Sequence, residues 1–276
     1  FASSLAVMFG YWNEVLPKIA FLFMFLPPLI LAYTFFNGSR YLIFLSIVFF
    51  TIGKYLFNGW ADGLIAVYFG LSALLTYLLI NDKNNFYKLN PLFYYITFCF
   101  FISLTLIKDE GSALLFILFI TAFFVKIFKQ ELNKDFFRLF FLLFSFLPII
   151  LWKIFCYSKG IDDNHINTES SFNLMSRIYE LNNYKLISYF LLLNEKFLIC
   201  LIFFLISFWI NWDKELFVFT SIVMIMYIGI LFFVFLSTSY DFYFQLNSTA
   251  ARVVKTLSFS LAFFGLYNLK DRIKNI

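Results

Sequence analysis

The stretch that decides the fold is residues 58–79, NGWADGLIAVYFGLSALLTYLL. A small polar cluster ends at Gly63, and the apolar run that starts at Leu64 carries no charge until Asp82. Such a run can cross a bilayer core as a helix, which takes about 20 residues. We therefore predict that Asp62 lies where a membrane helix leaves the hydrocarbon. There it is either a simple helix cap or a functional carboxylate.

The composition indicates a multi-span membrane protein. The chain is 62% hydrophobic and 13% charged, with a mean hydropathy of +0.86. A soluble domain of 276 residues cannot bury that much apolar surface. The net charge of +5 is spread over loops, so no basic block indicates nucleic acid. The predicted fold is all-α, a polytopic membrane helical bundle that forms a single domain over residues 1–276.

Apolar segments that alternate with polar turns predict about nine transmembrane helices. The predicted spans are residues 19–36, 41–57, 64–80, 91–107, 112–125, 139–155, 197–210, 216–236 and 256–269. Residues 108–111 and 237–255 are among the polar turns and loops between them. The longest polar segment is 156–196, and residues 174–193 within it are predicted to form one amphipathic helix on the outer membrane surface.

Basic residues in the short loops predict the orientation, because cytoplasmic loops carry an excess of Lys and Arg. Residues 81–88 and 126–138 hold six of these basic residues and are placed in the cytoplasm, together with the C-terminus. The opposite segments then face outward. These are the start of the chain, Asp62, residues 108–111, residues 156–196 and residues 237–255.

Three polar sets fall at the outward ends of predicted spans. They are Trp60 with Asp62; Lys108, Asp109 and Glu110 before Gly111; and Ser248, Thr249, Arg252 and Lys255. Each set alone also fits a helix cap, a solvated turn or a side chain that reaches the headgroups. Together they predict an outward cavity with acids and bases, suited to a phosphorylated lipid.

The single histidine of the sequence, His165, lies near Asp162, Asp163 and Glu169. These four residues have no fixed ligand spacing, so the pattern favours a solvated loop over a metal site. The three cysteines also lack metal-type spacing. No metal site is predicted, and the cofactor stays unknown, with a divalent metal as an open alternative.

Three motifs carry a resemblance to a known family. YLFNGWADGLIAVYFGLSALL (55–75), IKDEGSALLFILF (107–119) and QLNSTAARVVKTL (245–257) resemble, in order and spacing, the multi-span glycosyltransferases of the GT-C superfamily. GYWNEVLPK (10–18) fits as well. The resemblance is to bacterial relatives of the mannosyl- and aminoarabinosyltransferases. It implies a polyprenyl-phosphate-sugar donor and transfer to a cell-envelope acceptor on the outer face of the inner membrane.

The resemblance also implies roles for particular residues. Asp62 matches the acidic residue of the second outer loop, Lys108 and Glu110 match the K-x-E-G turn, and Arg252 matches the late S-x-x-R-type motif. The family's principal catalytic carboxylate lies in the first outer loop, which we expect to precede Phe1. The candidate catalytic residues here are Asp62 and Glu14, and the candidate substrate-binding residues are Lys108, Glu110, Arg252 and Trp60.

Two other classes stay open. A polymerase or ligase of surface polysaccharide is also multi-span and uses polyprenyl-linked glycans. A transporter is less favoured, because the predicted spans carry almost no central charge. A soluble sugar nucleotide is disfavoured as the donor, since the sequence has no compact glycine-rich nucleotide site. The expected partners are the lipid-linked sugar and membrane lipids, with no nucleic acid.

Overall fold

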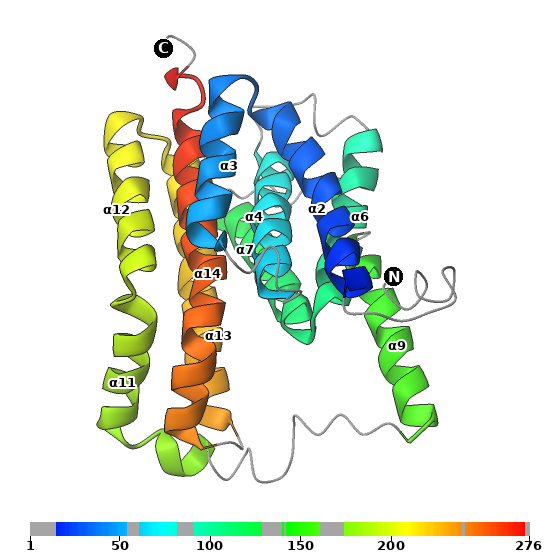
Figure 1. Ribbon diagram of the computed structural model, residues 1–276, viewed down its shortest axis with the longest axis vertical. Coiled ribbons are helices and arrows are strands. Elements are labelled where there is room, and N and C mark those ends of the chain that lie inside the picture. Colours follow the sequence, from blue (N-terminus) through cyan, green and yellow to red (C-terminus); the bar gives the residue numbers. More distant parts are fainter. Residues whose placement is uncertain are drawn as a thin grey trace.

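The computed structural model describes residues 15–53, 61–81, 91–128, 140, 142–160, 174–238 and 241–273. Over these residues the chain forms helices and no strand, and the helices pack into one bundle (Figure 1). The predicted all-α bundle is therefore confirmed.

The helices carry the labels of Figure 1. They are α2 (Val15–Phe35), α3 (Ser39–Thr51), α4 (Ala61–Ile80), α6 (Pro91–Ile107), α7 (Asp109–Phe128), the 3-10 helix η2 (Leu142–Phe146), α9 (Leu147–Ser158), α11 (Leu181–Leu192), α12 (Glu195–Ile210), α13 (Lys214–Ser237) and α14 (Phe242–Leu269). Helix α4 packs against α14, α6, α7 and α2, so it lies at the centre of the bundle.

The sequence of α4 explains its central position. From Asp62 to Ile80 every residue of this helix is buried. A helix that is apolar on all sides has no face for water and belongs inside a bundle. Gly70 lets α14 approach closely, because a Cβ at this position would lie 2.7 Å from the ring of Phe259. Asp62 on α4 and Arg252 on α14 therefore belong to two helices that pack closely against each other.

The prediction of a polar loop before the last span is wrong, because helix α14 starts earlier than expected. Residues 237–255 are not a polar loop, because α14 already begins at Phe242 and is about 42 Å long. Asp241 caps the helix by accepting a hydrogen bond from the Phe244 N–H at 2.8 Å. One face of the added turns is apolar and buried at helical spacing, which stabilises them although the other face is polar. The buried residues on that face are Phe242, Leu246, Ala250 and Val253.

The outer amphipathic segment is also shorter than predicted. A single helix over 174–193 is wrong, because residues 174–177 form one helical turn and α11 begins only at Leu181. Helix α11 packs against α14, α13 and α12 and buries Asn183, Ile187 and Leu191. Its axis is bent by 70° from that of α12. The pair has the composition of a broken span or a re-entrant loop, and its position on the membrane surface stays a prediction.

Several helices of the described chain could span a membrane, as the composition predicted. Four are long and apolar enough: Ala61–Ile80, Asp109–Ile127, Lys214–Ser237 and Phe242–Leu269. The bent pair of α11 and α12 would make a fifth. The remaining apolar helices are shorter: Phe23–Phe35, Ser39–Thr51, Pro91–Ile107 and Leu142–Ser158.

Candidate functional site

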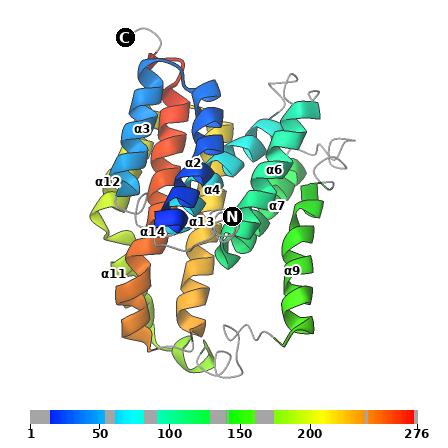
Figure 2. The ribbon, with the colours of Figure 1, turned by 45° about the vertical axis from the view of Figure 1, so that its right-hand side comes forward.

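Helices of unequal length create the setting of the site. α11, α13 and α14 continue beyond the level at which α4 begins and the α6–α7 turn lies (Figure 1, Figure 2). At this level Asp62 is in the first turn of α4, Lys108 joins α6 to α7, and Glu110 is in the first turn of α7. Arg252 approaches from within α14. The structure therefore brings together four of the six predicted site residues.

Hydrogen bonds connect these four side chains into one ion network. Arg252 Nε donates to Asp62 Oδ2 at 2.7 Å, and Arg252 Nη2 donates to Asp62 Oδ1 at 3.3 Å. Lys108 Nζ donates to Asp62 Oδ1 at 3.1 Å and to Glu110 Oε1 at 2.7 Å. Asp62 thus holds an arginine and a lysine side by side. Two acids and two bases give the network no net charge.

Burial differs strongly within the network. The Asp62 side chain is 3% exposed, whereas those of Arg252 and Lys108 are 31% and 29% exposed. A buried carboxylate is stable only when it is paired and hydrogen-bonded. Because both oxygens accept hydrogen bonds from cations, Asp62 is the ionised carboxylate and has little freedom to receive another proton. This geometry suits a residue that positions cations better than it suits a general base.

Lys108 keeps its charge at neutral pH. Burial alone lowers the pKa of this lysine, but the nearby carboxylates of Glu110 and Asp62 raise it by more. The pKa of Lys108 therefore lies above its ordinary value. The lysine is a permanent cation beside Arg252.

Gly111 explains why the K-D-E-G sequence can form this turn. Helix α6 ends at Ile107 and α7 begins at Asp109, so the predicted loop over 108–111 is mostly the first turn of α7. The Gly111 N–H donates to the Lys108 carbonyl oxygen at 2.8 Å. A Cβ at Gly111 would overlap the carbonyl oxygen of Leu104. Only glycine fits this turn, which fixes Lys108 and Glu110 beside Asp62.

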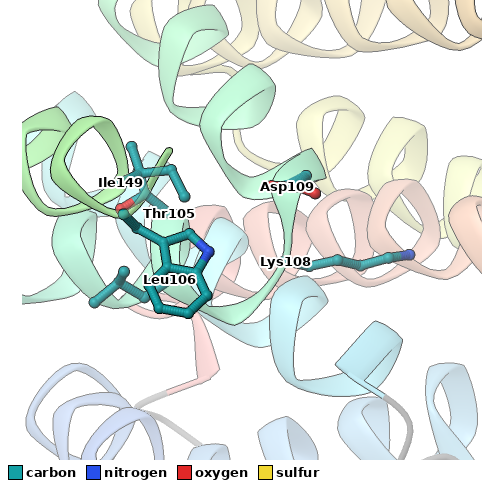
Figure 3. A pocket seen from close by; sticks show the side chains of 6 residues that line it. Thr105, Leu106, Lys108, Asp109 and Ile149 are labelled. Atoms are coloured by element: carbon teal, nitrogen blue, oxygen red, sulfur yellow. The ribbon is translucent and has the colours of Figure 1, made fainter. Parts of the chain in front are cut away.

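A cavity of ≈ 320 Å³ lies beside the network, between α6, α7 and α9. Its lining residues are Thr105, Leu106, Lys108, Asp109, Ile149 and Trp152. Figure 3 shows that Lys108 extends away from Thr105, Leu106 and Ile149. Lys108 thus lines the cavity and reaches the network with its ammonium group. Asp62, Glu110 and Arg252 are not among its described lining residues, so this is not a cavity that all four residues line. A common cavity for the four stays a prediction.

Other predicted residues have different outcomes. Glu14 and Trp60 lie outside the described residues, as do His165 and the acids around it. On α14, the Ser248 hydroxyl donates to its own helix at Phe244 O, 2.8 Å away. Within the described part of the chain, no three His, Cys, Asp or Glu side chains are grouped so that they could hold a metal ion.

Two cavity residues, Thr105 and Trp152, were not predicted. Both belong to apolar segments, where a threonine or tryptophan normally indicates helix packing or an anchor at the membrane interface. The signal that could have found Trp152 is weak, because this tryptophan lies near the end of the predicted span 139–155, where an interface anchor is equally expected. Sequence distance does not reveal that α9 packs against α6.

No family model, no curated protein and no solved structure matches the chain.

Proposed function

We propose that this chain is a multi-span membrane glycosyltransferase. It would move a sugar from a polyprenyl-phosphate donor to a cell-envelope acceptor on the outer face of the bacterial inner membrane. The observation that carries the proposal is the pair of cations, Arg252 and Lys108, that Asp62 holds at the first turn of α4. The motif resemblance supports the same reaction.

The chemistry follows from the charges. As the bond between the anomeric carbon and the phosphate oxygen breaks, negative charge grows on the leaving polyprenyl phosphate. Preorganised cations stabilise such charge, and a planar guanidinium suits two phosphate oxygens. The new bond forms from the anomeric carbon to the acceptor oxygen, whose proton passes to a carboxylate. Glu14 is the candidate for that base, with Asp62 as the residue that orients the cations.

The proposal includes a topology of about nine spans, in which the shorter helices also cross the membrane. In a variant whose native cysteines are replaced by serine, we expect Asn84→Cys to react only from the cytoplasmic side and Asn164→Cys only from outside. Labelling of intact cells with a membrane-impermeant maleimide measures this. Reaction of position 84 but not position 164 from outside would show the orientation to be reversed.

The role of Arg252 is tested by donor binding. With the full chain in nanodiscs, we expect Arg252→Ala to weaken undecaprenyl-phosphate binding by about tenfold, the scale of a charge-assisted hydrogen bond. Arg252→Lys should recover part of the loss, since it keeps the charge and loses the planar pair of donors. Native mass spectrometry can measure the bound lipid.

Arg40→Ala is the matched control for this test. Arg40 donates to the carbonyl oxygen of Lys270 at the opposite end of α14, so its loss should leave lipid binding unchanged. Equal affinities for Arg252→Ala and Arg40→Ala would contradict the role of Arg252. Transfer itself is assayed with a panel of undecaprenyl-phosphate hexoses and pentoses.

A transporter, which the sequence favoured less than a polymerase or ligase, becomes the second candidate because of one observation in the structure. Arg252 lies inside the membrane-length helix α14 and not in a loop, and its partner Asp62 is in the first turn of the membrane-length helix α4. Ionisable pairs inside such helices are typical of substrate or ion pathways. Uptake of a sugar or ion into proteoliposomes without any transfer to an acceptor would decide for this alternative.

A further inference from the structure

The cavity between α6, α7 and α9 has a mixed wall. Three of its lining residues are polar or charged (Thr105, Lys108 and Asp109), and three are apolar (Leu106, Ile149 and Trp152). Its volume of ≈ 320 Å³ is at the lower end of small-molecule sites, which span about 300–1,000 Å³. An acyl chain would leave the remaining acceptor positions of Thr105 and Asp109 unused. A small, ring-shaped ligand with both hydroxyl groups and C–H faces satisfies both halves.

We propose that this cavity binds the ring of a neutral sugar, with Trp152 as its aromatic platform. The inference deepens the proposed transferase function and rests on it for the origin of the sugar. The C–H bonds on one face of a pyranose ring carry partial positive charge, which the negative face of an indole attracts. Trp152 is 54% exposed. The ring of Phe155 stacks on the indole of Trp152 with 5.8 Å between the ring centroids, which helps to hold the indole in place.

Two further lining residues suit sugar hydroxyl groups. Asp109 is 62% exposed and pairs with Lys153 on α9 at 3.1 Å. A carboxylate has about four acceptor positions, so this pair leaves room to accept from hydroxyl groups. The Thr105 hydroxyl already donates to the Ile102 carbonyl oxygen at 2.8 Å, so its oxygen acts as an acceptor. The negative charge of Asp109 disfavours an acidic sugar beside it, whereas the ammonium group of Lys108 extends away to the ion network (Figure 3).

Lys108 connects the cavity to the ion network. The residue lines the cavity, while its ammonium group lies 3.1 Å from Asp62, which Arg252 also contacts at 2.7 Å. A sugar in the cavity and a phosphate at the two cations would therefore contact the same lysine. A sugar joined directly to a phosphate has its two parts next to each other, and this shared lysine gives the cavity its place in the proposed reaction.

The simpler reading of Trp152 is an anchor at the membrane interface. Helix α9 has no buried residue, so its surface offers many lipid contacts. Trp209 provides the matched control, because it is 87% exposed and belongs to α12, a helix on the opposite side of the bundle from α9 (Figure 1). A general anchoring effect should appear for both tryptophans, whereas a sugar effect should appear for Trp152 alone.

The first experiment compares lipid-linked ligands on the full chain in nanodiscs. The probes are undecaprenyl phosphate and its glucosyl, mannosyl and galactosyl forms. For at least one sugar we expect binding to exceed that of the bare lipid by about tenfold, the scale of a good aromatic contact. Trp152→Leu should remove this gain and leave binding of the bare lipid intact. Trp152→Phe should keep part of it, and Trp209→Leu all of it.

The second experiment does not depend on a lipid donor. Saturation-transfer NMR measures contact between the protein and free methyl glucoside, methyl mannoside or methyl galactoside. We expect transfer to the ring protons of at least one glycoside in the wild type and in Trp209→Leu, and its loss in Trp152→Leu. Binding of the lipid-linked form alone identifies the donor sugar, and binding of free glycosides as well indicates an acceptor sugar.

The outcomes separate the two proposals. If no form of undecaprenyl phosphate binds, the proposed function fails, and the glycoside experiment still tests the cavity. If the bare lipid binds but neither experiment shows a sugar effect that depends on Trp152, the sugar inference is overturned and the function stands. An equal effect of Trp152→Leu and Trp209→Leu also overturns it, because both residues would then act as anchors.

Discussion

Replacing Gly111 by alanine is expected to disrupt the α6–α7 turn and with it the candidate site. The new Cβ would overlap the Leu104 carbonyl oxygen, a backbone atom that cannot rotate away. The two helices must separate at this turn, which moves Lys108 away from Asp62 and breaks their hydrogen bond. We expect a loss of about 3 kcal/mol or more, since overpacking here also breaks hydrogen bonds.

Thermal unfolding of the purified full chain in detergent measures this loss, and Gly229→Ala is the matched control. Gly229 lies within α13, and a Cβ there would meet no atom within 4 Å. Alanine is the better helix former, so Gly229→Ala should leave the unfolding temperature equal or slightly higher. Similar destabilisation by the two substitutions would refute the special role of the α6–α7 turn.

The fold was predictable where the sequence is uniformly apolar. The run from Leu64 to Ile80 predicts a helix, because a segment without charge that enters a bilayer must satisfy its backbone hydrogen bonds internally. The start of α14 was not predictable in the same way. Its first turns alternate polar and apolar residues, so composition indicates a loop while the 3.6-residue period indicates a helix. Packing against α11 and α13 favours the helix.

The sequence predicted which residues of the site meet, but not how they are arranged. Charges at the edge of hydrocarbon must find partners or water, and this requirement predicted that Asp62, Lys108 and Arg252 would meet. The sequence does not show how deeply each of these side chains is buried. The structure buries the acid and leaves the two cations partly exposed. This arrangement favours a role for Asp62 in positioning cations over a role as a proton acceptor.

Asp62→Asn is expected to have the second large effect, and it distinguishes these roles. The substitution keeps the shape of the side chain, but its amide nitrogen would face Arg252 or Lys108, donor against donor. Breaking a buried ion pair by changing one partner typically costs about 3–5 kcal/mol, and partial exposure of the cations places this case at the lower end. Asp241→Asn is the control for stability, because asparagine caps a helix as well as aspartate does.

Transfer by the full protein should fall by about 10²-fold or more in Asp62→Asn, the scale of a catalytic or closely positioned group. If Asp62 is the base, kcat should fall while binding of undecaprenyl phosphate stays the same. If Asp62 positions the cations, Arg252 and Lys108 lose their common anchor, so KM for the donor should change along with kcat. The Asp62→Asn/Arg252→Ala double variant then shows little further loss beyond either single variant, because the two residues act as one unit. Transfer at the wild-type rate in Asp62→Asn would reduce Asp62 to a helix cap, and it would remove the observation on which the proposed function depends.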